Sequence, residues 1–190
     1  VLRMKEIGGF FSLEDFGKKE FYSDLLALNS CRNAFLYLLR AMNYQKAYLP
    51  LFLCDSIAQT CHNEGVEVEF YSIDKNFFPV FSRTIENNEV LLVVNYYGQL
   101  SCENILKLKQ KYKNIVIDNT QAFYQRPLNG VDTIYSCRKF FGVPDGAYLS
   151  SKIKYEKPLL SDLSKDRMAA LLGRFEGVAS AYYETFKAIE

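Results

Sequence analysis

The sequence contains no tryptophan and only one histidine, His62, among its 190 residues. One histidine leaves little scope for a His-based catalytic triad or for a zinc site. The five cysteines are odd in number and form no Cys-x-x-Cys pair. We therefore expect no metal catalysis, and we expect reduced thiols in a cytoplasmic protein.

Long runs of one residue class are also missing. No stretch approaches the ~20 apolar residues that a membrane-spanning helix needs, and the N-terminus has no apolar signal core. The charge is balanced, with 23 Lys and Arg against 22 Asp and Glu, and no basic block marks a nucleic-acid surface. We expect a soluble protein whose partners are small or neutral molecules rather than membranes or nucleic acids.

What is present is enough apolar sequence, 49% of the chain, to build a core. Short apolar runs, typical of strands, lie at residues 26–28, 47–49, 66–71, 90–95, 115–118, 133–136 and 147–150. Amphipathic stretches, typical of helices, lie between them at residues 32–42, 55–64 and 102–112. This alternation predicts an α/β fold: a three-layer sandwich whose mostly parallel sheet is covered by helices on both faces.

The ends of the predicted strands carry polar residues. Asn95, Asp118 and Ser136 each follow or close an apolar run. In open parallel sheets, ligands bind beyond the carboxyl ends of the strands. The sequence therefore predicts that these three side chains share one edge of the sheet.

Asp118 and Lys139 are the pair with the most chemical content. A lysine amine can form a Schiff base with the aldehyde of pyridoxal phosphate, and a carboxylate can keep the cofactor's pyridine nitrogen protonated. Phe140 and Phe141 could dehydrate the amine, which would make it nucleophilic at neutral pH. The alternatives are an Asx-turn at Asp118 and an ordinary solvated loop lysine at Lys139.

Residues 26–34 predict a strand followed by a helix. The free N–H groups at the start of that helix favour an anion, so a cofactor phosphate would fit there. The alternative is that Asn29 or Ser30 is an ordinary N-cap.

The chain resembles the fold-type I pyridoxal phosphate enzymes and, among them, the DegT/DnrJ/StrS sugar aminotransferases. The motifs that carry the resemblance are the opening segment 7–11, the phosphate turn 29–34, the loop from Pro50 onward, the strand end 93–98, the block 118–122 and the lysine segment 139–147. The resemblance implies the large domain of such an enzyme, with an amino-acid donor, a sugar-nucleotide acceptor and a homodimeric assembly.

By the same resemblance, Asp118 pairs with the pyridine nitrogen, Gln121 lies near the phenolic oxygen of the ring, and Lys139 is the Schiff-base lysine. The phosphate turn contributes Ser30, Cys31 and Arg32. Asn95 closes the matching strand.

The chain departs from the family pattern at several positions. Cys31 stands in place of the glycine of the phosphate turn, and Cys54 lies where relatives have an aromatic residue over the ring. The family's serine before the lysine falls on Ile134, so Ser136 and Arg138 are the candidates for the phosphate contact.

The expected organisation is a cofactor-binding large domain at residues 1–165. Residues 173–190 have a helical pattern that stops without a C-terminal cap signal. Residues 166–190 are expected to begin the helical connection to a small C-terminal domain outside this chain. The chain is thus expected to be a fragment.

The first functional hypothesis is an aminotransferase that moves an amino group, with glutamate as the expected donor, onto a keto-sugar nucleotide. The second is a diverged or truncated relative that binds the cofactor weakly or serves as an interaction module in surface-polysaccharide synthesis. Lyase or dehydratase chemistry would use the same lysine and aspartate. An unrelated nucleotide binder would need a glycine fingerprint, which residues 29–32 lack.

Overall fold

The computed structural model describes residues 9, 19–161 and 164–188. Of the predicted opening segment 7–11, only Gly9 falls within the described residues. The strands are β1 (Leu26–Leu28), β2 (Lys46–Pro50), β3 (Glu67–Ile73), β4 (Pro79–Val80), β5 (Glu89–Val94), β6 (Ile115–Asp118), β7 (Asp132–Ser136) and β8 (Ala147–Ser150). The α-helices are α1 (Cys31–Ala41), α2 (Asp55–Asn63), α3 (Cys102–Lys111), α4 (Ala169–Glu176) and α5 (Tyr183–Ala188). The 3-10 turns are η1 (Tyr96–Gly98), η2 (Ser164–Arg167) and η3 (Ala179–Tyr182).

The strands form one sheet of eight in the order β1-β8-β7-β6-β5-β2-β3-β4. Neighbours among β2, β3, β5, β6 and β7 pair in parallel, whereas β8 is antiparallel to both β7 and β1, and β4 is antiparallel to β3. The predicted mostly parallel sheet is confirmed. Because β6 lies between β5 and β7, both edges of its backbone are hydrogen-bonded within the sheet.

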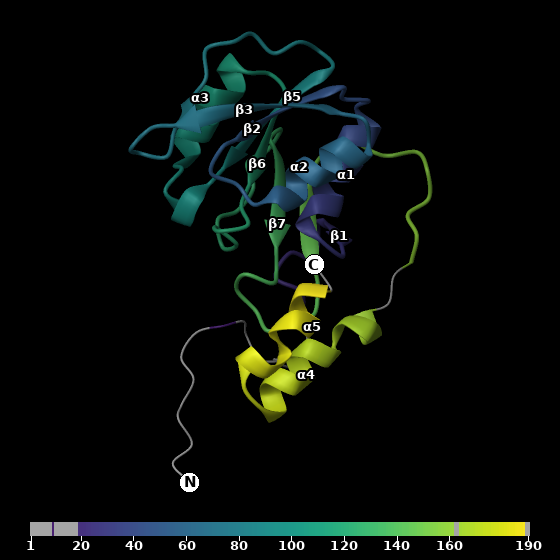
Figure 1. Ribbon diagram of the computed structural model, residues 1–190. Helices are drawn as coiled ribbons and strands as arrows, with labels where there is room; N and C mark the ends of the chain where they lie inside the picture. Colours follow the sequence, from purple (N-terminus) through teal and green to yellow (C-terminus); the bar gives the residue numbers. More distant parts are fainter. Residues whose placement is uncertain (1–8, 10–18, 162–163, 189–190) are drawn as a thin grey trace.

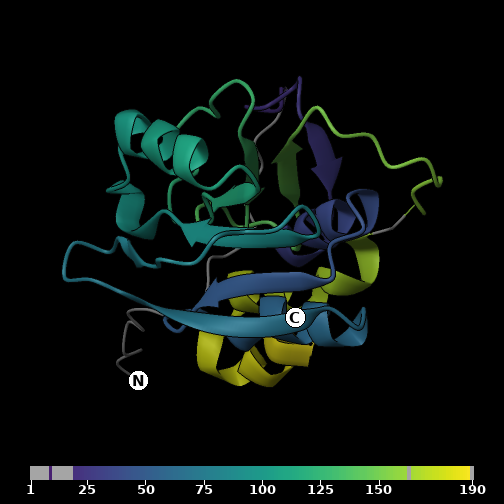
Figure 2. The same ribbon diagram turned by 90° about the horizontal axis from the view of Figure 1, so that it is seen from above.

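Helices cover both faces of the sheet, as predicted. Figures 1 and 2 show α1 and α2 on one face and α3 on the other. Side chains alternate between the two faces along each central strand: Leu92 and Val116 pack on the side of α1, and Leu91 and Ile115 pack on the side of α3. Parallel strands buried on both faces need such continuous apolar runs, which is why the sequence pattern identified them.

The start of α1 is fixed by a serine cap. The Ser30 hydroxyl accepts a hydrogen bond from the Asn33 N–H at 3.3 Å, and Ser101 caps α3 in the same way through Asn104. These caps satisfy backbone donors that the first helical turn leaves without partners. The cap at Ser30 also sets the N-terminus of α1 directly after β1, at the same edge of the sheet as the ends of β6 and β7.

The C-terminal part of the chain forms α4 and α5, which lie beyond the end of β7 (Figure 1). A helical pattern was expected from residue 166 onward, and the structure has it in separate pieces because α4 ends at Glu176, with Gly177 as its C-cap, and η3 follows. In the described part of the chain, no helix has the length and apolar character that a bilayer crossing requires.

Candidate functional site

The carboxyl edge of the sheet brings several of the predicted residues together. Asp118 is the last residue of β6, Ser136 is the last residue of β7, and Asn95 follows β5 directly. All three are buried. The prediction that these strand ends share one edge is confirmed by the parallel register of β5, β6 and β7.

Asp118 is a buried carboxylate, with 4% of the residue exposed. Its Oδ1 accepts a hydrogen bond from the Thr120 N–H at 2.8 Å, which is the Asx-turn considered as the alternative. Burial raises the pKa of Asp118, while hydrogen bonds from Thr120, the charge of Lys139 and the Cys31 thiol act in the opposite direction. Desolvation is the dominant cause, so a further positive group would stabilise this carboxylate.

The Cys31 thiol lies against this acid. Its Sγ is 3.9 Å from Asp118 Oδ1 and 3.2 Å from Thr120 Oγ1. Burial raises the pKa of the Cys31 thiol well above its usual value, and the charge of Asp118 raises it further. Cys31 is therefore a neutral side chain that borders the carboxylate, at the position where the resembling family has glycine.

Lys139 lies in an exposed turn directly after β7. The turn is closed by the Cys137 carbonyl, which accepts hydrogen bonds from the N–H groups of Phe140 at 3.0 Å and Phe141 at 2.9 Å. The Lys139 charge lowers the pKa of Asp118, so the two groups are within electrostatic reach. Among the described residues they form no direct ion pair, which leaves the amine and the acid separated.

The N-terminus of α1 is close to the same site, because Cys31 is its first residue. Arg32 follows, and Ser30 precedes as the N-cap. Asn29 is tied to this turn by the Asn33 side chain, whose Nδ2 donates to Asn29 Oδ1 at 2.7 Å. Ser30 is thus an ordinary N-cap, and the anion-binding character of the helix end remains a prediction.

Asn95 has a structural role. Its Nδ2 donates to Asn119 Oδ1 at 3.0 Å and to Gln125 Oε1 at 2.8 Å, and its Oδ1 accepts from the Leu100 N–H at 2.8 Å. These bonds hold the loop after β6 against the loop after β5. Its predicted contact with a cofactor remains a prediction.

The other predicted residues lie around the edge. Gln121 Oε1 accepts a hydrogen bond from the Tyr97 N–H at 3.2 Å. Cys54 is exposed at the start of α2 and lies near enough to Cys31 to affect its pKa. The Arg138 guanidinium lies 4.8 Å from the centre of the Phe186 ring in α5, so Arg138 contacts the C-terminal helices.

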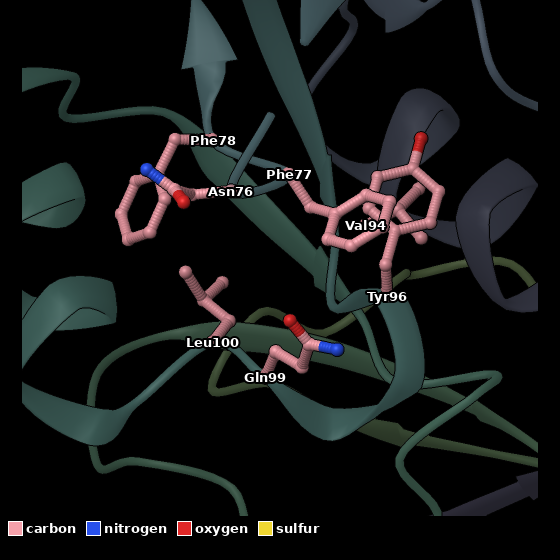
Figure 3. Close-up of a pocket in the computed structure, with 7 residues that line it drawn as sticks. All are labelled: Asn76, Phe77, Phe78, Val94, Tyr96, Gln99 and Leu100. Carbon is pink, nitrogen blue, oxygen red and sulfur yellow. The ribbon is translucent and has the colours of Figure 1, made fainter. Parts of the chain in front are cut away.

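An aromatic group at this edge was not predicted. Phe52 stacks on Tyr96 with ring centres 5.4 Å apart, and Phe77 contacts both Tyr96 and Tyr97. Phe52 is 56% exposed and lies two residues before Cys54. Its closeness to Cys54 in the sequence could have indicated an aromatic ring near that predicted site residue. Figure 3 shows the adjacent hollow, lined by Phe77, Tyr96 and Gln99 among others. It has room for about one water molecule, and neither Asp118 nor Lys139 lines it.

The chemistry of these groups fits pyridoxal phosphate. A buried carboxylate that lacks a directly paired cation among the described residues suits a protonated ring nitrogen. An exposed amine can reach an aldehyde, and a helix N-terminus suits a phosphate. The donor set therefore fits the cofactor.

Comparisons with known proteins agree with this fold. No family model matches the sequence, and no curated protein matches it. The crystal structure of NtdA from Bacillus subtilis, with bound cofactor PMP, is similar at 17% identity and a TM-score of 0.56 over 68% of this chain and 33% of that chain. A putative aminotransferase from Burkholderia pseudomallei gives 13% identity and a TM-score of 0.52 over 87% of this chain and 56% of that chain.

A third structure, 3-amino-5-hydroxybenzoic acid synthase, has 16% identity and a TM-score of 0.51 over 65% of this chain and 37% of that chain. The chain spans between a third and little more than half of the length of these neighbours. At such low identity the similarity concerns the fold. The chain therefore has the α/β fold of aminotransferase large domains, with a mixed and mostly parallel sheet.

Proposed function

We propose that this chain is the cofactor-binding large domain of a pyridoxal phosphate-dependent aminotransferase. The observation that carries the proposal is that buried Asp118 ends β6, while exposed Lys139 lies in the turn after β7, the neighbouring parallel strand. The aminotransferase-like fold supports it, and NtdA, a protein of that fold, was crystallised with PMP.

The cofactor, when bound, supplies an aldehyde for an amino group and an electron-accepting ring. Lys139 would hold the cofactor through its amine and, once released, would move a proton at the reacting carbon as general base and acid. Asp118 would keep the ring nitrogen protonated. The N-terminus of α1, with Ser30, Cys31 and Arg32, would bind the phosphate together with Ser136.

The remaining site residues would orient the ring. Gln121 would lie near the ring's phenolic oxygen, and Asn95 would support the loops that frame it. Cys54 would border the ring face, where Phe52 offers the nearest exposed aromatic surface. Arg138, which contacts Phe186, would act on the phosphate only if its guanidinium left that ring.

The substrates follow from the resemblance to sugar aminotransferases. We propose an amino-acid donor, with glutamate as the first candidate, and a keto-sugar nucleotide acceptor. The five thiols are free, which suits a reducing compartment such as the cytoplasm. We also propose that residues 166–190 begin the connection to a small domain.

A homodimer is part of the proposal. Leu51 and Tyr97 are 65% and 61% exposed near the carboxyl edge, and Phe52 is exposed beside them. Burying such side chains against a second copy would stabilise association. Sedimentation of the wild type and of Phe52→Ser should show a dimer that the substitution weakens, whereas a wild-type monomer at every concentration would contradict the dimer.

The cofactor proposal is tested by trapping. The purified chain is mixed with pyridoxal phosphate, reduced with borohydride and digested, and the modified lysine is identified by mass spectrometry. We expect a yellow protein with the label on Lys139, and no site-specific label in Lys139→Met. Lys75→Met is the matched control, because Lys75 also lies in an exposed turn.

A second candidate function is cofactor binding without turnover. The observation that favours it is the Cys31 thiol against Asp118, where the family has glycine. A protein that is labelled on Lys139 yet releases no keto acid from any amino-acid donor would support this candidate, including a role as a module in polysaccharide synthesis. A colourless protein without labelled Lys139 would contradict the enzyme and would favour a relative that serves as an interaction module without the cofactor.

A further inference from the structure

The C-terminal segment 164–188 contacts Asp145, which belongs to the same loop as Lys139. The Asp145 carboxylate accepts hydrogen bonds from Arg167 Nε at 2.8 Å and from the Ser164 hydroxyl at 2.8 and 2.9 Å. It also pairs with Arg167 Nη2 at 2.6 Å. The two charged side chains are 17% and 24% exposed, so this ion pair is shielded from water more than a surface pair.

A second contact lies next to the lysine itself. Arg138, which immediately precedes Lys139, places its guanidinium 4.8 Å from the centre of the Phe186 ring. Phe186 belongs to α5, which lies beyond the end of β7 (Figure 1). Segment 164–188 therefore touches the loop 137–146 on both sides of Lys139 in the sequence.

Further contacts tie this loop to residues beside β1 and β8 and to Phe123 in the loop after β6. The Gly146 N–H donates to the Asn29 carbonyl at 2.8 Å, and the Cys137 N–H donates to the Gly146 carbonyl at 2.9 Å. The rings of Phe140 and Phe141 pack on Phe123, with ring centres 5.8 and 4.8 Å away. The base of the loop is thus fixed by β1 and β8, and its C-terminal side at Asp145 is fixed by segment 164–188.

We propose that segment 164–188 is a positioning element for Lys139, and that Arg167 is its principal positioning residue. The proposal rests on the proposed function, because it concerns the geometry of the amine toward the cofactor. Arg167 acts through Asp145 and touches no reacting atom. Its two-pronged contact restricts the loop, and the restricted loop presents the amine in one orientation.

The energetic argument concerns populations. If the loop occupies the competent geometry only part of the time, apparent cofactor affinity falls by that fraction. A charge-assisted pair with two hydrogen bonds is strong enough to change that fraction about ten-fold. Loss of Arg167 should therefore weaken cofactor binding without removing any cofactor contact.

The experiment compares Arg167→Met with Arg40→Met. Arg40 binds the two carboxylate oxygens of Glu64 through Nε and Nη2, at 2.7 and 2.6 Å, between α1 and the end of α2. Arg167 uses the same two nitrogens, both of which bind Oδ2 of Asp145. Both substitutions remove a guanidinium that binds one carboxylate, but only Arg167 is tied to the lysine loop. Two quantities are measured for each protein: amide hydrogen exchange of residues 137–146, and cofactor affinity by spectroscopic titration.

We expect Arg167→Met to speed exchange in residues 138–145 and to weaken cofactor binding about ten-fold, with both quantities unchanged in Arg40→Met. Arg167→Lys keeps the charge without the fork and should fall between the two. Should Arg167→Met fail to fold, Arg167→Lys and Asp145→Asn carry the comparison. Equal exchange and equal affinity in the Arg167 and Arg40 variants would overturn the positioning role.

Hydrogen exchange separates this proposal from the proposed function. Exchange in the loop is measured without cofactor, so faster exchange in Arg167→Met with no cofactor binding by any protein would support the attachment and refute the cofactor role. If every variant were trapped normally on Lys139 with unchanged cofactor affinity, the cofactor role of Lys139 would be supported and the positioning role of Arg167 would be refuted.

Discussion

Asp118 and Lys139 contrast in how the fold holds them. Asp118 ends a central strand that pairs on both sides, and it is buried with its Oδ1 bound by the Thr120 N–H. Lys139 lies in an exposed turn outside the sheet, and its loop is attached through Phe123, Gly146 and Asp145. The position of the acid is set by the sheet, whereas that of the amine is set by long-range contacts of a loop.

The contrast separates chemical effects from geometric ones. A substitution of Asp118 changes charge in a place that β5 and β7 keep fixed. A substitution around Lys139 leaves the amine intact and changes where it points. Variants of the two regions should therefore differ in which measurement they alter.

The largest expected effect is the loss of turnover on substitution of Asp118. Asp118→Asn keeps an acceptor for the Thr120 N–H and removes the charge that would keep the ring nitrogen protonated. Because it removes one preorganised electrostatic group, turnover should fall by about 10²–10³-fold. The measurement is keto acid released from an amino-acid donor, and labelling of Lys139 should continue. Undiminished turnover would show that Asp118 does not act on the ring.

Gly146→Ala should distort the backbone of the loop that carries Lys139. Gly146 has φ of +118°, and an added Cβ would lie 3.2 Å from Cys137 Sγ and 3.3 Å from its Cβ. Strain at such a position should lower the free energy of unfolding by about 1–3 kcal/mol. Borohydride labelling of Lys139 by the cofactor should decrease as well. Chemical denaturation checks the first effect and borohydride labelling the second.

Gly130→Ala is the control for that substitution. Gly130 also has a positive φ, +79°, but nothing lies within 4 Å of an added Cβ. Its cost should be smaller, and labelling of Lys139 should not change. Equal losses of stability in the two variants would mean that the contact with Cys137 is without consequence.

Much of the fold could be predicted because its signals are local. The strand 115–118 was predicted with its observed bounds, since buried parallel strands need continuous apolar runs. The strand 147–150, which is antiparallel to β1 and β7, was also predicted with its observed bounds, from its short apolar run. β4 was missed because two residues carry no periodic pattern. The helical region from residue 166 was predicted without its break after Glu176, where Gly177 adopts a non-helical backbone conformation.

The site was predictable only in part. The rule that ligands bind beyond the carboxyl ends of parallel strands correctly predicted that Asp118 and Asn95 lie at the carboxyl edge of the sheet. The side-chain amide of Asn95, however, holds two loops together. The contact of Cys31 with Asp118 and the pair of Asp145 with Arg167 join residues distant in sequence. No local pattern encodes such contacts.

A pH titration sharpens the comparison further. Burial raises the pKa of Asp118 above its ordinary value of 3.8, so the folded state binds this proton more tightly than the unfolded state. The contribution of this group to stability is therefore present at low pH and is lost as pH rises through the raised pKa. Asp118→Asn lacks that contribution.

The measurement is the free energy of unfolding of both proteins across the acidic range. The value for wild type minus that for Asp118→Asn should fall as pH rises above 3.8 and then become constant. A difference that rises with pH would mean that the charged carboxylate is stabilised in the folded protein, against the dominance of desolvation.

The smallest expected effect uses one cysteine from each region. Burial raises the pKa of Cys31 well above its usual value, and that of Cys137 to about 12. Both thiols should therefore react slowly with an alkylating reagent, while exposed Cys102 reacts fast.

In Arg167→Met the loop that begins at Cys137 loses its attachment to segment 164–188, so the rate of alkylation of Cys137 should rise by about ten-fold as local opening becomes easier. Cys31 is held by α1 and by the sheet, and its rate should stay the same. Mass spectrometry of timed, alkylated samples resolves the two sites, and a parallel rise at both would show that the variant loosens the whole domain and that the two regions are not held independently.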